Sequence, residues 1–300
     1  MPGPSRALPS FKSLGQLVSR PRWLRFGDRR FLWLLLAGLA FFWNTSLLWL
    51  SNQAETIQAL NLMLWIGVWL AIEDHGPRLL PRPSGISSFA GVLFIALTLV
   101  RGVWVSNDQD HFAYLLLPLL VFSLALLNRP PSQWRIFWKP LIIATLLPLS
   151  RLITNGLLAP LLVQLTAKLT WTLLYALGFR AFLHGAEVQL GSGGVLVAGG
   201  CAGTEQLNFT VSVVVIFLLV FPLERLFHIA LVIAASIVGA VLVNGVRIAL
   251  LAYFTSWPNQ LGMPAFHFLH DSYGSLLFSL VAVSIVGWIY LTLLDRELAA

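Results

Sequence analysis

Long apolar blocks separated by short polar segments run along almost the whole chain. Eight such blocks cover residues 31–50, 57–73, 88–105, 112–128, 140–163, 203–223, 227–253 and 272–294. Their length matches the roughly 20 residues with which an α-helix crosses a hydrocarbon core of ~30 Å. Membrane β-strands would be about half as long and would alternate polar with apolar residues. The pattern therefore predicts an all-α polytopic membrane protein with about eight transmembrane helices.

The segment 140–180 departs from this regular pattern. It is too long for one crossing and too short for two, and Pro148 and Pro160 interrupt it. Arg151 and Lys168 would also be costly near the middle of the bilayer. We expect a single span that is followed by an amphipathic helix on the outer face of the membrane.

The stretch "GAEVQLGSGGVLVAGG" shows a different period. Val188 and Leu190 alternate with polar neighbours, a glycine-rich turn follows at 191–194, and further valines come after it. Alternation on both sides of such a turn is typical of a β-hairpin. A short hairpin of this kind would lead the chain directly to Cys201.

The composition agrees with a membrane protein, since 58% of the residues are hydrophobic and 10% are charged, whereas soluble domains carry about 25% charged residues. The net charge of +7 comes from basic residues that gather at the N-terminus and in short loops. If the chain starts in the cytoplasm, 14 of its 19 Lys and Arg residues lie in segments on that side. Because basic loops favour the cytoplasmic side, we expect both chain ends in the cytoplasm and the spans in the cell (inner) membrane. We expect no nucleic-acid partner.

This topology divides the chain into three regions. Residues 1–30 form a basic cytoplasmic segment, 31–139 a membrane region of four helices, and 140–300 the membrane region that carries the candidate site. The first apolar block has full membrane length and no small-residue cleavage site. We therefore interpret it as an uncleaved first span rather than a signal peptide.

Three chemically reactive side chains fall at one level of the membrane in this topology. Cys201, the only cysteine of the chain, lies at the outer end of the span 203–223. Arg247 lies about 33 Å along the next helix from Arg225, and so reaches the outer interface. His270 stands directly before the last span. We therefore expect a thiol, a guanidinium and an imidazole to meet at the outer face.

Each of these residues also has a simpler explanation. Cysteine is often a small apolar core residue, a long arginine side chain can extend to the lipid headgroups, and His270 could be an ordinary loop residue. Against this, glycines surround Cys201, and a helix N-terminus favours the thiolate, which is the nucleophilic form. Asn244 lies one turn before Arg247 and could orient it. An imidazole titrates near neutrality and can take a proton from a thiol.

At these residues the sequence resembles the exosortase/archaeosortase family. The resemblance rests on Cys-x-Gly at the start of one span, Asn-x-x-Arg within the next and His-x-x-x-Gly opening the last, over about residues 140–294. The motifs are formed by Cys201 with Gly203, Asn244 with Arg247, and His270 with Gly274. Ala202 lies where many relatives have serine, and the polar run Thr204-Glu205-Gln206 follows it. In this respect the sequence resembles a cyanobacterial branch of the family (cyanoexosortase).

The resemblance implies a membrane-embedded cysteine peptidase or transpeptidase that needs neither a metal nor another cofactor. Its substrates would be exported proteins whose C-terminal signal combines a short motif (Pro-Glu-Pro in bacteria), a hydrophobic helix and a basic tail. Cys201 would form a thioester, and His270 would accept a proton or stabilise the transition state. Arg247 would stabilise the oxyanion or protonate the leaving amine, and the first role is favoured because arginine is a poor acid at neutral pH. The site would face the periplasmic or extracellular side. Its supporting residues would be Gly203, Asn244, Asp271 and Gly274.

Three other interpretations stay open at this point. A metal-dependent hydrolase could use His267, His270 and Asp271, although His-x-x-His is shorter than the usual zinc-protease spacing. A serine protease would need Ser192, which falls in the predicted turn. A transporter or a scaffold without a catalytic thiol is the alternative from another class, but the chain shows no convincing internal repeat. The sequence indicates neither the acyl acceptor nor the oligomeric state.

Overall fold

A computed structural model describes residues 29–73, 81–105, 110–191, 193–257 and 259–299 of the chain. Within these ranges eight helical segments are long and apolar enough to cross a membrane, which confirms the polytopic all-α architecture. They are formed by α2 (Arg29–Leu50), α3 (Glu55–Glu73), α4 (Gly85–Val103), η2 (His111–Leu115) with α5 (Leu116–Asn128), α6 (Trp138–Ile153) with α7 (Ala159–Ala176), α8 (Thr204–Val220), α9 (Leu226–Thr255) and α11 (Ser272–Leu298).

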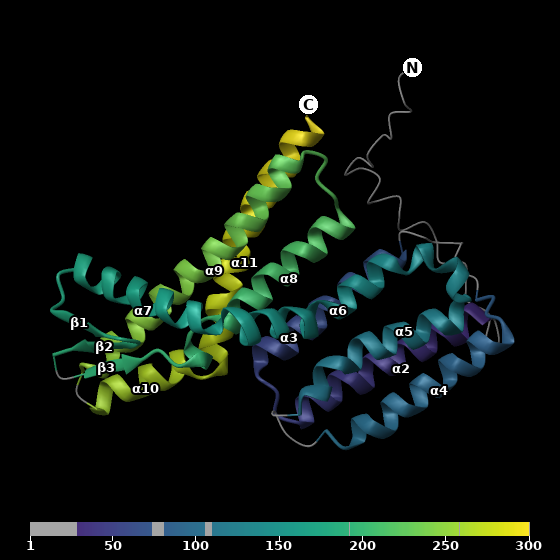
Figure 1. Ribbon diagram of the computed structural model, residues 1–300, viewed down its shortest axis with the longest axis horizontal. Coiled ribbons are helices and arrows are strands. Elements are labelled where there is room, and N and C mark those ends of the chain that lie inside the picture. Colours follow the sequence, from purple (N-terminus) through teal and green to yellow (C-terminus); the bar gives the residue numbers. More distant parts are fainter. Residues whose placement is uncertain (1–28, 74–80, 106–109, 192, 258, 300) are drawn as a thin grey trace.

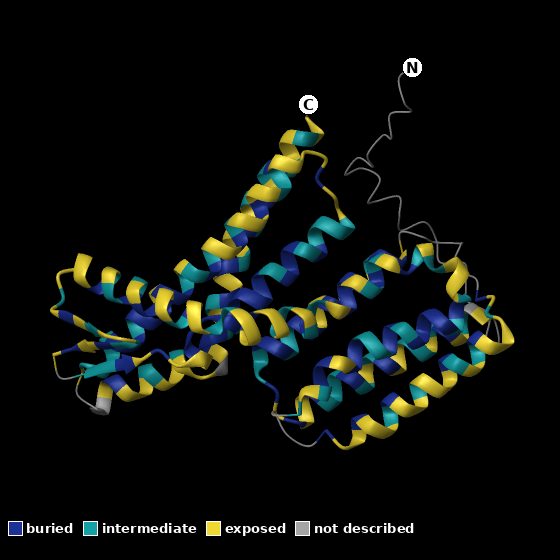
Figure 2. Ribbon diagram, in the orientation of Figure 1, coloured by how far each residue is buried: buried dark blue, intermediate teal, exposed yellow. Residues whose placement is uncertain are grey.

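The outer faces of these helices are as apolar as their core. Phe42, Trp49, Trp104 and Trp288 are each at least 70% exposed, and Figure 2 shows long exposed stretches on α4, α9 and α11. Aromatic side chains in such numbers on the surface indicate a lipid environment rather than water. The described helices therefore bury one apolar face against each other and present another to the bilayer.

Most of the segment 140–180 belongs to one helical run, Trp138–Ala176, without a reversal of the chain. A π-helical turn, η4 (Thr154–Leu158), joins α6 to α7. The turn lies just before Pro160, whose missing N–H interrupts regular helical hydrogen bonding. The whole run counts as a single candidate span of 39 residues. A continuous run agrees with the prediction of one span followed by a further helix, and the position of that helix on the outer face of the membrane stays a prediction. α7 lies beside α9 and the sheet (Figure 1).

A three-stranded antiparallel sheet follows α7 and extends the predicted hairpin. Its strands are β1 (Ala181–His184), β2 (Glu187–Leu190) and β3 (Gly193–Leu196), paired in the order β1-β2-β3. The hairpin of β2 and β3 was predicted, whereas β1 was not, because its four residues do not alternate between polar and apolar. The sheet packs closely on the end of α9: a Cβ at Gly193 would lie 2.4 Å from the Thr255 carbonyl oxygen.

The segment between the last two spans is a helix, where the sequence indicated only a loop. This helix, α10 (Asn259–His270), contains Gly262 and Pro264, both of which are unfavourable inside helices. Gly262 allows a close contact with α9, since a Cβ there would lie 2.2 Å from the Phe254 carbonyl oxygen. Phe266 and Leu269 pack against the buried cluster around Cys201. Tertiary packing therefore stabilises α10 against its local preference.

Candidate active site

Cys201 ends a short turn that leads into α8. The turn η5 (Gly199–Cys201) is a single 3-10 turn, and Gly203 caps the helix with a φ of 83°, a left-handed conformation that glycine adopts without strain. Cys201 is 9% exposed. A Cβ added to Gly199 or Gly200 would meet no atom within 4 Å. The thiol is thus held at the N-terminus of a spanning helix, with open space beside the glycines before it.

His270 faces the thiol from the last residue of α10. Its Nε2 lies 3.7 Å from the Sγ of Cys201, which is within the range of a weak hydrogen bond to sulfur. The imidazole ring stacks on Phe266, with centroids 5.2 Å apart and planes 13° apart. Asp271 lies on the other side of the ring, with its Oδ1 3.5 Å from Nδ1. The stacked ring and the carboxylate together orient Nε2 toward sulfur.

Arg247 holds the helix end that carries His270. Its Nε donates to the Leu269 carbonyl and its Nη2 to the His270 carbonyl, both at 3.0 Å. These carbonyls belong to the last turn of α10, where a helix lacks internal donors and has a partial negative charge. The side chain is 4% exposed, so Arg247 does not extend to lipid headgroups but serves as a buried cap of α10.

Asn244 connects the guanidinium to the backbone of Cys201. Its Nδ2 donates to the Cys201 carbonyl at 3.0 Å, and its Oδ1 accepts from Nη1 of Arg247 at 3.5 Å. Gly203 packs directly on this amide, because a Cβ there would lie 2.7 Å from the Asn244 side chain. The short distance requires glycine, and it brings the start of α8 against α9.

Gly274 has a comparable role at the start of α11. A Cβ at this position would lie 2.3 Å from the Phe268 carbonyl oxygen and 2.6 Å from the Leu269 Cα. The first turn of α11 therefore touches the last turn of α10. This contact and the Arg247 hydrogen bonds fix the same helix end, and with it the position of His270.

The structure brings the predicted residues into one connected group, with one difference from the expected arrangement. The thiol and the imidazole face each other directly, as predicted. The guanidinium reaches Cys201 through Asn244, and reaches His270 through the backbone carbonyl. Three of its five N–H groups have acceptors in this group. Gly203 allows α8 to pack closely on α9, and Gly274 allows α11 to pack closely on α10.

Two threonines of α7 belong to the site but carried no signal in the sequence. The Oγ1 of Thr166 donates to the Ala202 carbonyl at 3.1 Å, and that of Thr170 donates to the Gly245 carbonyl at 3.4 Å. A threonine on a helix beside apolar residues is common, so only the fold reveals these contacts. They connect α7 to the residue after the thiol and to the helix turn between Asn244 and Arg247.

A second polar group surrounds Glu205, in the first turn of α8. Its Oε2 accepts from Thr56 of α3 at 2.9 Å, and its Oε1 lies 3.9 Å from Nη1 of Arg151 in α6. The Arg151 guanidinium also lies over the Tyr114 ring, 4.3 Å from its centroid. These partners explain how α6 accommodates a cation. They also join the N-terminal helices to the helix that carries Cys201.

The structure bears on only one of the two alternative catalytic centres, the metal site. Within the described part of the chain, no three His, Cys, Asp or Glu side chains are grouped so that they could hold a metal ion. His267 packs edge-to-face on Phe266, with centroids 5.7 Å apart. Ser192 lies outside the described residues.

The comparison with protein families agrees with this geometry. A family model described as transmembrane exosortase matches residues 49–287, which is well over half of the chain. The match includes the turn before Cys201, all of α8 and α9, and the whole of α10. Neither a curated protein nor a solved structure matches the chain significantly.

Proposed function

Because the chain belongs to the transmembrane exosortase family, we propose that it is a membrane-embedded cysteine peptidase or transpeptidase with Cys201 as nucleophile. The observation that carries the proposal is the 3.7 Å approach of the Cys201 Sγ to Nε2 of His270. A thiol beside an imidazole that a third group orients is the general arrangement of an activated cysteine nucleophile. The assignment to a cyanobacterial branch stays a prediction.

The proposed reaction has two steps. The thiol transfers its proton to Nε2 of His270 as sulfur attacks the scissile carbonyl carbon. The tetrahedral intermediate then collapses to a thioester on Cys201, and the imidazolium gives its proton to the leaving amine. In the second step water or an acceptor amine attacks the thioester, the imidazole takes its proton, and the thiolate leaves and is reprotonated.

Arg247 has two proposed roles in this scheme. Through the carbonyls of Leu269 and His270 it positions the imidazole. Its two remaining N–H groups are free of acceptors among the described contacts and could donate to the oxyanion, a kind of interaction worth about 3 kcal/mol for one donor. A guanidinium stays protonated at neutral pH, so electrostatic stabilisation is favoured over proton transfer.

The proposed substrates are exported proteins with a short C-terminal motif, a hydrophobic helix and a basic tail. The hydrophobic helix of the substrate would lie in the bilayer beside the protein. The basic tail of the substrate would stay on the cytoplasmic side, where both ends of the protein chain are expected. The motif would then reach Cys201 on the periplasmic or extracellular side of the cell membrane. Two observations support this: the spans are apolar toward lipid, and basic residues gather in the segments assigned to the cytoplasm.

Removal of the thiol tests the proposal. We expect Cys201→Ala to stop substrate processing, with a loss of at least about a thousandfold, while the protein still inserts into the membrane. Ala202→Ser is the matched control, because it changes the adjacent residue and leaves the thiol in place. If Cys201→Ala processed substrate at the wild-type rate, Cys201 would not be the nucleophile and the proposal of a cysteine enzyme would be wrong.

A further inference from the structure

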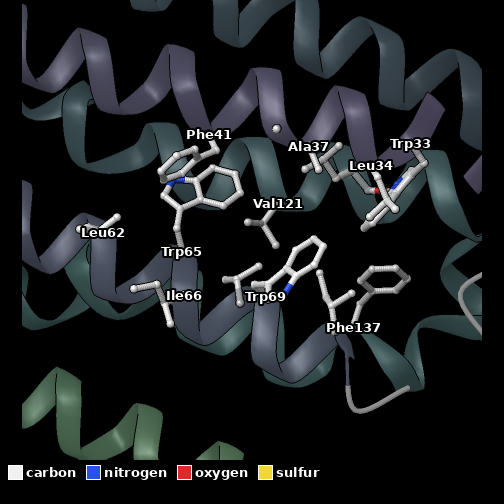
Figure 3. Close-up of a pocket in the computed structure, with 14 residues that line it drawn as sticks. Trp33, Leu34, Ala37, Phe41, Leu62, Trp65, Ile66, Trp69, Val121 and Phe137 are labelled. Atoms are coloured by element: carbon white, nitrogen blue, oxygen red, sulfur yellow. The ribbon is translucent and has the colours of Figure 1, made fainter. Parts of the chain in front are cut away.

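An apolar pocket of about 320 Å³ lies between α2, α3 and α5, apart from the residues around Cys201 (Figure 3). The indole N–H groups of two lining tryptophans are used inside the protein: Trp33 donates to the Leu124 carbonyl and Trp65 to Oδ1 of Asn44, both at 2.9 Å. These rings therefore present only carbon surfaces to the pocket. Apart from the indole N–H of the half-exposed Trp69, the other lining side chains carry no polar atom, so the pocket suits a hydrocarbon chain.

The mouth of the pocket faces the bilayer. Leu62, Ile66 and Trp69 line it from α3 and are between 39% and 49% exposed. On α2 it is bordered by Gly38, where an added Cβ would meet no atom within 4 Å. Because both helices are membrane spans, the medium at this opening is lipid rather than water. The volume is about twice the ~150 Å³ of an apolar cavity that stays dry and binds benzene.

A cation stands at one end of this region. Trp33 and Phe137 lie at the same end of the pocket (Figure 3). Trp33 also lines a neighbouring groove of about 710 Å³ between α2 and α4, and the lining of that groove includes Arg29. Arg29 is one helical turn before Trp33, at the start of α2. Along α2, the cationic Arg29 is thus followed by the apolar walls of the pocket. This arrangement is complementary to an anionic lipid, in which a charged headgroup is followed by acyl chains.

We propose that this region is a binding site for a phospholipid with an anionic headgroup. One acyl chain fills the pocket between α2 and α3, the phosphate lies at Arg29, and the groove beside Trp33 takes the second chain. The lipid comes from the leaflet at the side where α2 begins. The site does not depend on the proposed enzymatic activity, since none of its residues belongs to the group around Cys201.

Lipids with brominated acyl chains test this site, because bromine quenches tryptophan fluorescence at short range and three tryptophans line the pocket. The protein is reconstituted in phosphatidylcholine vesicles, and brominated phosphatidylglycerol or brominated phosphatidylcholine replaces part of the lipid. We expect half-maximal quenching at an about fivefold lower mole fraction of phosphatidylglycerol, as one cation near the headgroup would give.

Two variants distinguish recognition of the lipid headgroup from binding of the acyl chain. Arg29→Gln should make the two lipids quench at equal mole fractions, while Arg296→Gln, a change at an exposed arginine of α11, keeps the wild-type preference. Gly38→Leu should fill the pocket and reduce the depth of quenching. Gly287→Leu on α11 is the matched control, because that glycine also faces open space.

Three results would overturn the proposal. Identical quenching by both lipids in the wild type would exclude a specific anionic site, as would a Gly38→Leu variant that is quenched like the wild type. A wild-type dimer that dissociates on Gly38→Leu would mean that a second copy of the chain covers the pocket instead of lipid.

Discussion

Arg247 carries a full charge in the buried part of a spanning helix, and the way it is compensated determines the geometry of the site. Burial of a guanidinium costs several kcal/mol unless hydrogen bonds replace its water. Here the acceptors are two backbone carbonyls of α10 and the side chain of Asn244. The charge is therefore satisfied only when α9, α10 and the start of α8 are assembled correctly. This makes the position of His270 depend on Arg247.

A lysine in place of Arg247 should distinguish the effect of the positive charge from the effect of the hydrogen-bond geometry. Arg247→Lys keeps a cation, but one ammonium group cannot reproduce the planar, two-carbonyl contact. We expect kcat to fall about a hundredfold with little change in KM, a loss of near 3 kcal/mol. Arg101→Lys is the control, because that arginine is half-exposed and pairs with Asp110 at the surface. Full activity of Arg247→Lys would show that charge alone matters.

The sequence was sufficient to predict which side chains lie together at the candidate site but not most of their hydrogen-bond partners. Cys201, Arg247 and His270 could be predicted because such side chains are rare in apolar spans and fall at one membrane level. Two of the three acceptors of the guanidinium could not, because they are backbone carbonyls of a helix that the sequence did not indicate, whereas the third, Asn244, was expected to orient Arg247. Thr166 could not be predicted either, since a single threonine is unremarkable in a helix.

At the scale of the elements, length and hydrophobicity predicted the spans because lipid leaves few alternatives to a helix. Most predicted boundaries differ from the observed ones by a few residues, as for 227–253 against Leu226–Thr255 of α9, whereas the span predicted at 140–163 belongs to a helical run that continues to Ala176. The short elements outside the spans were predicted less well. In α10 a glycine and a proline hide the helical pattern, and the close contact with Phe254 that Gly262 permits is a tertiary interaction. Local sequence carries no information about such contacts.

The start of α8 provides a test of how strictly this packing controls the site. In Gly203→Ala the new Cβ meets Asn244 at 2.7 Å while φ is 83°, so we expect strain of about 1–2 kcal/mol and loss of the hydrogen bond to the Cys201 carbonyl. Processing should slow at least tenfold, and the melting temperature should fall.

Gly287→Ala is the matched control for this change. That glycine lies inside α11 with no atom within 4 Å of an added Cβ, and alanine favours a helix by about 0.5–1 kcal/mol. We expect it to leave processing unchanged and to raise stability slightly. If Gly203→Ala behaved in the same way, the contact between α8 and Asn244 would have no role in activity.

At the scale of the whole molecule, the sheet and α10 lie together at one end, away from the C-terminus (Figure 1). An even number of crossings returns the chain to the side from which it starts, and the described residues contain eight candidate spans. The division into a basic segment 1–30, a four-helix region 31–139 and a catalytic region 140–300 stays a prediction. The hydrogen bond from Thr56 to Glu205 and the position of Arg151 over the Tyr114 ring show that the last two of these regions share an interface.

The orientation can be measured because removal of Cys201 leaves no other cysteine. In a Cys201→Ala background, His184→Cys places a thiol on the sheet and Asp295→Cys places one near the end of α11, both at exposed positions. We expect a membrane-impermeant maleimide to label the first in intact cells and the second only after permeabilisation, because basic segments favour the cytoplasmic side. The opposite labelling would reverse the proposed topology.

The most direct test is the covalent intermediate itself. The protein is mixed with a peptide that carries the C-terminal signal, quenched with acid and analysed by intact mass. We predict a mass increase equal to the N-terminal part of the peptide, attached at Cys201, removed by hydroxylamine and absent in Cys201→Ala. Attachment at another residue, or cleavage of the peptide by Cys201→Ala at the wild-type rate, would contradict the role of this thiol as the nucleophile.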